Sequence, residues 1–197
     1  GGFLVSRLGN GSTTTFDFRE TAPAGAHPEM FLKDGKYNPD LHHDSHLAVG
    51  VPGTVAGLYD AFEELGSKKV SWRRLVEPAV VLAREGFIVT DGLARSLKDV
   101  LPKMKKYPAA LEQFSRKGVP YEMGDILRQP DLAKTLERIA ERGPRGFYEG
   151  ETARLLAKEM KANGGLITQA DLKAYRAIQR KPLVGKYRGY SVIGMPP

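Results

Sequence analysis

The feature that most restricts the fold is the separation of β-prone and helix-prone segments along the chain. Runs rich in β-branched and aromatic residues lie at the two ends, within 3–18 and 178–193. In the long middle the apolar residues recur at helical spacing. This order of strands, helices and strands predicts an α+β fold. Because no internal repeat and no low-complexity linker divides it, we predict a single partial domain over 1–197.

The β-prone ends predict a small sheet with unpaired edges. Phe3–Val5 and Thr13–Phe18 are expected to form a hairpin around the turn residues 9–11. Two further β-like runs, Ile178–Val184 and Tyr187–Ile193, close the chain. So few strands leave open edges that invite pairing. We therefore expect the sheet to be completed by another segment.

The middle of the chain predicts a series of amphipathic helices after an extended loop at 23–44 and a short strand at 47–51. Thr54 is the expected N-cap of the first helix, and Thr168 with Asp171 is an expected capping box. Pro78 should kink or split the second helix, because it removes a backbone donor. The predicted spans are 54–66, 71–86, 91–101, 109–114, 130–143, 150–162 and 168–175.

Composition excludes several classes of protein. With 41% hydrophobic and 27% charged residues the chain is an ordinary globular one. Its net charge is +7, but the cations are scattered among acidic neighbours, so we predict no nucleic-acid binding. Cysteine is absent, which excludes a disulfide framework and a thiolate nucleophile. No run is apolar enough for a membrane span, and the start lacks a signal-peptide layout.

A cluster of imidazoles in the predicted loop is a candidate metal site. His42, His43 and Asp44 are adjacent, and His46 lies just beyond them. Imidazole and carboxylate are common zinc ligands. The helical spacing that would bring two ligands together is missing, however, and loops often expose histidine. We therefore expect no metal there.

The stretch Asp17–Pro23 contains the residue most suited to bind a ligand, Arg19. A guanidinium is permanently charged and presents a planar fork of donors that matches a carboxylate. An arginine held at the end of a strand can therefore orient a carboxylate-bearing ligand. Most arginines lie on solvated surfaces, where ion pairs contribute little. Arg19 alone therefore does not separate a ligand-binding residue from an ordinary surface arginine.

A series of motifs in the same order over the whole chain resembles the γ-glutamyltranspeptidase family. The motifs are Arg19-Glu20-Thr21-Ala22-Pro23, the run 45–58 (Ser-His-Leu-Ala-Val-Gly-Val-Pro-Gly-Thr-Val-Ala-Gly-Leu), Glu77-Pro78-Ala79, the run 82–89, Gly146–Gly150, Asn163–Thr168 with Asp171-Leu172, Tyr187–Tyr190 and Met195-Pro196-Pro197. Ordered matches of this kind are more specific than any single motif.

The resemblance implies a part of the N-terminal nucleophile hydrolase fold, a four-layer αββα sandwich. Members of the family are made as precursors that cut themselves into a large and a small subunit, and the new N-terminal threonine of the small subunit is the nucleophile. This chain is similar to a fragment of the large subunit. It then carries no catalytic residue of its own, and none of Thr13, Thr14, Thr15 and Thr21 takes that role.

The resemblance also implies a substrate and a site. Arg19 matches the family arginine that pairs with the α-carboxylate of the γ-glutamyl group, and Glu20 would support it. The complete enzyme would cleave glutathione or related γ-glutamyl compounds through a γ-glutamyl-enzyme and pass the acyl group to water or an amino acid. The implied partner is the small subunit with its threonine. We expect no cofactor and no metal, and a periplasmic or extracellular location.

Two other functions stay open from the sequence. One is an acylase on the same fold, acting on cephalosporins or processing poly-γ-glutamate. The other is a non-catalytic binding or structural segment that keeps the fold without turnover. A threonine at the processed terminus of the missing part would separate this last alternative from the enzymes.

Overall fold

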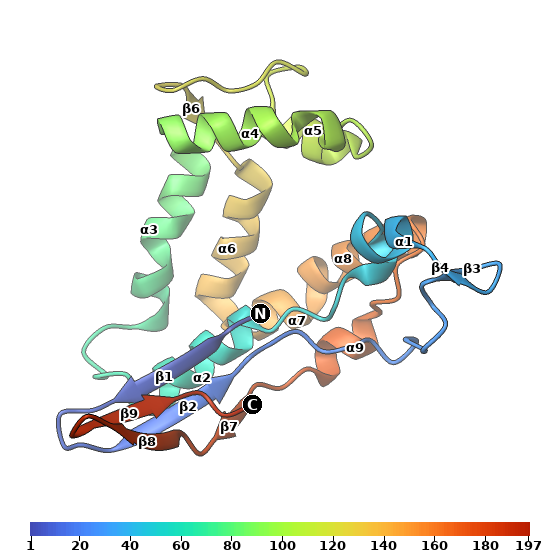
Figure 1. The fold of residues 1–197 in the computed structure, drawn as a ribbon. Coiled ribbons are helices and arrows are strands. Elements are labelled where there is room, and N and C mark those ends of the chain that lie inside the picture. The colour runs from blue at the N-terminus through green and yellow to red at the C-terminus, as the bar shows by residue number, and fades with distance from the viewer. The chain divides into compact units, whose positions relative to one another are not determined.

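The computed structural model describes all residues, 1–197, and its contacts divide the chain into two compact units. The first unit consists of Gly1–Trp72 and Glu141–Pro197, and the second of Arg73–Ala140. Helices and strands are both present, as an α+β fold requires (Figure 1). The expectation of one partial domain stays a prediction.

The first unit is built on a three-stranded antiparallel sheet. Strands β1 (Phe3–Arg7) and β2 (Thr13–Asp17) form the predicted hairpin, and β7 (Ile178–Arg180) pairs with β2 on its other side. Asp17 lies opposite Phe3 and Ile178 in this register. The order β1-β2-β7 leaves β1 and β7 at the two edges of the sheet.

The last strands form a separate ribbon. β8 (Leu183–Tyr187) and β9 (Tyr190–Gly194) pair only with each other, and Val184 and Tyr190 are largely exposed. The predicted continuous run 178–184 is therefore wrong. It is interrupted at Lys181–Pro182, because proline has no N–H to donate to a strand ladder.

Helices and loops of the first unit enclose its cores. The elements are β3 (Leu32–Lys33), β4 (Lys36–Tyr37), α1 (Pro39–His43), a 3₁₀ helix (His46–Ala48), α2 (Thr54–Leu65), α7 (Arg145–Tyr148), α8 (Gly150–Ala162) and α9 (Gln169–Ala174). The larger core contains Val51, Ala56, Tyr148, Ala153, Met160, Ile167, Leu172 and Tyr175. A smaller one joins Phe16 and Phe18 of the sheet region to Ala61 of α2.

Two predictions for the stretch before α2 are wrong. The loop 23–44 contains the hairpin of β3 and β4 and the helix α1, which is capped by the Asn38 side chain. In the expected strand 47–51, residues 47–48 belong to the 3₁₀ helix, and only Val51 forms a bridge, with Thr21. The Ser45 hydroxyl accepts from the Leu47 N–H, and such local hydrogen bonds compete with strand pairing.

Helix α2 differs from its prediction at the N-cap. Its N-cap is Gly53, not Thr54, and no side chain caps it. The buried residues are Ala56, Gly57 and Ala61, whereas Leu58 is 44% exposed. Gly57 matters because, without a Cβ, it lets the helix approach Phe18 closely.

The second unit is mainly helical. It contains most of α3 (Trp72–Glu85) and of α6 (Pro130–Arg142), together with α4 (Asp91–Met104), α5 (Pro108–Phe114) and the paired strands β5 (Phe87–Ile88) and β6 (Ile126–Leu127). Pro78 does not split α3, and a kink there stays a prediction. Contrary to prediction, α4 continues past Pro102. The continuation of α3 beyond its proline coincides with the burial of Val80 and Ala83. None of the helices is long and apolar enough to cross a membrane.

Candidate functional site

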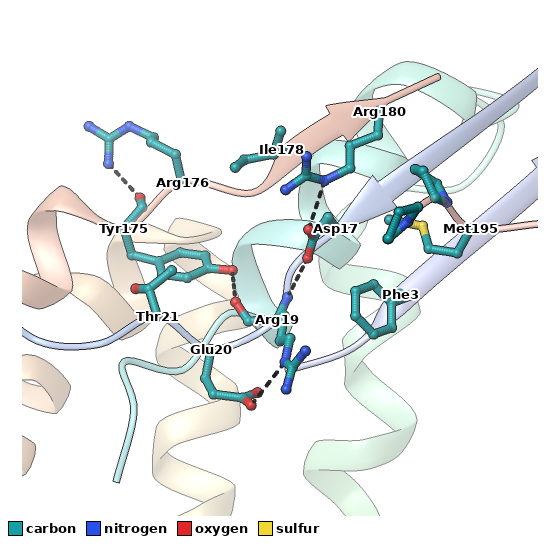
Figure 2. A pocket seen from close by; sticks show the side chains of 12 residues that line it. Phe3, Asp17, Arg19, Glu20, Thr21, Tyr175, Arg176, Ile178, Arg180 and Met195 are labelled. Atoms are coloured by element: carbon teal, nitrogen blue, oxygen red, sulfur yellow. Dashed lines mark hydrogen bonds and ion pairs between the residues drawn. The ribbon is translucent and has the colours of Figure 1, made fainter. Parts of the chain in front are cut away.

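Arg19 lies at the edge of a hollow in the first unit. It follows β2 and the buried Phe18, which anchors this turn of the chain in the smaller core. Its own side chain is 69% exposed. The hollow has a volume of about 510 Å³ and is lined by Phe3, Asp17, Arg19, Glu20, Thr21, Tyr175, Arg176, Ile178, Arg180, Met195, Pro196 and Pro197 (Figure 2).

The charges around the hollow are not equally satisfied. Arg180 donates to the Asp17 carboxylate at 2.9 Å, so this pair is closed within the protein. Arg19 has a looser partner, because its Nε lies 3.6 Å from Oε1 of Glu20. A distance of this size is an ion pair without a short hydrogen bond. The fork of donors on Arg19 is therefore open to a ligand carboxylate.

Asp17 is an ionised anchor behind Arg19. Burial raises the pKa of this carboxyl, but the backbone N–H of Arg19 and the guanidinium of Arg180 donate to it, and together with the nearby charges they hold the pKa below its ordinary value. The Arg19 N–H bond to Asp17 Oδ1 is 3.1 Å long. Asp17 thus fixes the backbone of Arg19, and Arg180 neutralises the charge of the Asp17 carboxylate.

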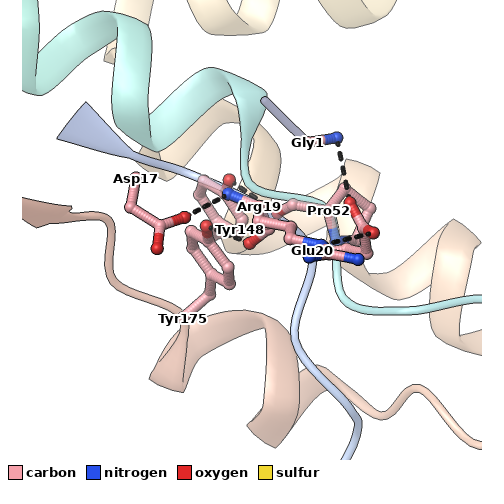
Figure 3. A network of polar contacts seen from close by, with 7 residues as sticks. All are labelled: Gly1, Asp17, Arg19, Glu20, Pro52, Tyr148 and Tyr175. Atoms are coloured by element: carbon pink, nitrogen blue, oxygen red, sulfur yellow. Dashed lines mark hydrogen bonds and ion pairs between the residues drawn. The ribbon is translucent and has the colours of Figure 1, made fainter. Parts of the chain in front are cut away.

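The backbone on both sides of the Arg19 peptide is also held (Figure 3). The hydroxyl of Tyr175 donates to the Arg19 carbonyl at 2.8 Å. Two residues later, Thr21 exchanges hydrogen bonds of 3.3 and 2.8 Å with Val51. The segment that carries Arg19 is therefore fixed by contacts with β2, with the segment before α2 and with the end of α9.

Glu20 lies beside Arg19, as expected for a supporting residue. Its carboxylate is half exposed, with one oxygen near Arg19 Nε and the other 3.7 Å from the Gly1 nitrogen. Gly50 packs against its side chain so closely that a Cβ there would lie 2.9 Å from Glu20 Cγ. The two predicted site residues are together in the structure, and their roles stay predictions.

The histidine cluster does not assemble a metal site. His42 and His43 both contact the hydroxyl of Tyr37, at 2.7 and 3.3 Å, and their rings stack on each other. His46 lies apart from them and pairs with Glu159 at 3.3 Å. No group of three or more metal-ligating side chains is placed to hold a metal ion.

Sequence reasoning missed several residues of the hollow. The sequence marks Asp17 only as the first residue of the motif and Tyr175 only as the end of a helix, and no pattern points to Arg180. Arg180 pairs with a residue 163 positions earlier and Tyr175 with one 156 positions earlier. No local pattern reports such pairings. The only local signals are the charges of Asp17 and Arg180 in strands and the hydroxyl of Tyr175 at a helix end.

The capping box next to this site gives a testable prediction. The Asp171 carboxylate accepts from Thr168 and from the backbone N–H of Ala24 at 2.8 Å, which ties the loop after the Arg19 motif to α9. Burial raises the Asp171 pKa, but the bonds from Thr168 and then from Ala24 outweigh it and leave the pKa below its ordinary value of 3.8. The ionised form is therefore the one that stabilises the fold.

Asp171→Asn is expected to lower the free energy of unfolding by about 1 kcal/mol at pH 7. A lowered native pKa gives stability that is present above the unfolded pKa and is lost as the pH falls through the native value. The difference from the parent protein should therefore shrink below pH 3.8. Urea unfolding of both proteins at pH 7 and below pH 3.8 measures this difference in the free energy of unfolding. Asp131→Asn, at an exposed carboxylate of α6, is the control, and an equal loss there would contradict the prediction.

Comparison with known proteins decides the family. A family model described as gamma-glutamyltranspeptidase matches residues 1–197. The chain belongs to this family. Its α+β fold is part of the αββα sandwich of the N-terminal nucleophile hydrolases, as the solved structures of its relatives show.

Three relatives illustrate the range of similarity. The chain is 50% identical to the glutathione hydrolase proenzyme of Escherichia coli, over 100% of this chain and 34% of that protein. The crystal structure of Helicobacter pylori γ-glutamyltranspeptidase matches with a TM-score of 0.97 at 43% identity, covering all of this chain and 56% of that one. An acylase ACY 1 proenzyme of Pseudomonas sp. is 36% identical over the whole chain and 36% of its own length. The chain thus spans about a third of the curated relatives it matches.

Proposed function

We propose that this chain is the large-subunit part of a γ-glutamyl transferase/hydrolase that acts on glutathione and related γ-glutamyl compounds. The observation that carries the proposal is Arg19, fixed by its backbone at the edge of the hollow with its fork of donors open. The similarity to glutathione hydrolase proenzymes over the whole chain supports it.

In this proposal Arg19 binds the α-carboxylate of the γ-glutamyl group through two parallel hydrogen bonds. Glu20 holds the guanidinium in place from the side. The exposure of Arg19 supports the presence of a further component, because an ion pair binds tightly only where water is excluded from it. The small subunit is the partner that would cover this face.

The small subunit would also supply the chemistry. Its N-terminal threonine attacks the γ-amide carbonyl, with its own α-amine as the base, and the amine of the donor leaves. Water or an amino acid then takes the acyl group from the threonine oxygen. The isolated chain is therefore inactive. Processing of a precursor and export to the periplasm or the cell exterior belong to the same proposal.

The test uses the complete protein after maturation. We expect hydrolysis of glutathione and of a γ-glutamyl anilide, and transfer when an amino acid acceptor is added. A mature protein that carries the terminal threonine but releases neither product would contradict the proposal and favour a non-catalytic role.

The acylase relative keeps one alternative function in view. An acylase of this fold would prefer a cephalosporin side chain or poly-γ-glutamate to glutathione. Comparing kcat/KM for these three substrates in the mature protein separates the alternatives, since the ratio reports differential transition-state binding.

A further inference from the structure

The direction of the Arg19 side chain depends on the backbone from which it starts. The side chain is 69% exposed and its ion pair with Glu20 is loose, so side-chain contacts hold it only weakly. The peptide groups around it are fixed instead, by Asp17 at the N–H and by Tyr175 at the carbonyl. Whatever holds these peptide groups therefore determines where the guanidinium points.

Tyr175 is well placed for this role. It directly follows α9, is only 6% exposed, and stacks on Tyr148 with ring centroids 5.7 Å apart and planes inclined by 5°. Tyr148 in turn donates to the Pro52 carbonyl at 2.8 Å (Figure 3). It also accepts from the Ala56 N–H. The ring of Tyr175 is therefore packed in the larger core against the Tyr148 ring, and its hydroxyl reaches the Arg19 carbonyl from there.

The absence of a side chain at Gly53 leaves room for the contact between Tyr175 and Arg19. A Cβ at Gly53 would overlap both the Tyr175 hydroxyl and the Phe18 carbonyl, and would lie 2.6 Å from Cζ of the tyrosine. Burial, and after it the carboxylates Asp17, Glu20 and Asp60, raise the pKa of Tyr175 to about 12. The phenol therefore stays a hydrogen-bond donor at any pH at which such a protein works.

We propose that Tyr175 is a positioning residue for Arg19, and that its hydroxyl holds the Arg19 carbonyl so that the guanidinium meets the carboxylate of the donor. The inference rests on the proposed function, because it assigns Tyr175 to the same site. Tyr175 acts on donor binding only through the backbone of Arg19.

The matched pair of variants is Tyr175→Phe and Tyr148→Phe in the complete processed protein. Each removes one hydroxyl from a stacked, 6% exposed tyrosine and keeps the ring. We expect both to lower the Tm by similar amounts. Only Tyr175→Phe should raise KM for a γ-glutamyl anilide, by about 5-fold with kcat little changed, since a net hydrogen bond of ordinary strength supports donor binding there.

A double-mutant cycle with Arg19→Lys separates positioning from general destabilisation. If Tyr175 acts through Arg19, adding Tyr175→Phe to the Arg19→Lys variant should change KM by less than about 2-fold, because the two effects are coupled. Additive effects on KM, or an equal rise of KM in Tyr148→Phe, would overturn the inference.

Crystal structures of the two phenylalanine variants test the same idea without any substrate. If the Arg19 side chain is displaced in Tyr175→Phe but not in Tyr148→Phe, Tyr175 positions it. If Arg19 stays in place in Tyr175→Phe, the inference is overturned, and this result does not depend on the substrate of the protein. A KM that responds to Arg19→Lys but not to Tyr175→Phe would likewise overturn this inference and leave the proposed function intact.

Discussion

Replacing Arg19 with lysine is expected to raise KM for a γ-glutamyl donor by about 10- to 100-fold with little change in kcat, because the lost bidentate contact is worth about 1.5–3 kcal/mol. Lysine keeps the charge but presents a point donor, and it cannot span both oxygens of a carboxylate. Glu20, 3.6 Å from the Arg19 Nε, would also compete for a flexible ammonium. Initial-rate kinetics of the processed protein measure the effect.

Two controls give this result its meaning. Arg95→Lys changes an equally exposed arginine on α4, which pairs with Asp91, and should leave KM unchanged. A donor with a 4-aminobutanoyl group in place of the γ-glutamyl group lacks the α-carboxylate, so Arg19→Lys should barely alter its KM. An unchanged KM for the carboxylate-bearing donor would remove Arg19 from the site.

Gly57→Ala is expected to destabilise the fold by about 3 kcal/mol, at the upper end of what overpacking usually costs. A Cβ at this position in α2 would overlap Cβ, Cγ and Cδ1 of Phe18. These atoms lie at the base of a buried side chain and cannot swing away, so the helix or the strand end must shift. Because Phe18 precedes Arg19, the same shift should also disturb the candidate site. Thermal and urea unfolding measure the loss.

Gly92→Ala is the matched helical control. Gly92 lies in α4, and a Cβ there would meet nothing within 4 Å. Alanine has the higher helix propensity by up to about 1 kcal/mol, so this variant should be as stable as the parent protein or slightly more so. If the two variants have the same stability, close packing of α2 on Phe18 is not a constraint on the fold.

The family and several of the local elements follow from the sequence alone. Helix α8 begins and ends where the periodicity predicts, and the capping box of Thr168 and Asp171 forms as expected, because both features depend on residues a few positions apart. The hairpin of β1 and β2 has the same origin. The motif around Arg19 was recognisable because its residues are contiguous in the chain.

How that motif is held depends on contacts between distant segments. The role of Gly57 inside α2 was not predictable, since glycine is unfavourable in a helix and its value appears only when Phe18 packs against it. The same applies to Tyr175, whose partner is the carbonyl of Arg19, 156 residues away. Local propensity and periodicity are properties of neighbouring residues. Close approach and hydrogen bonding between distant segments exist only after the chain has folded.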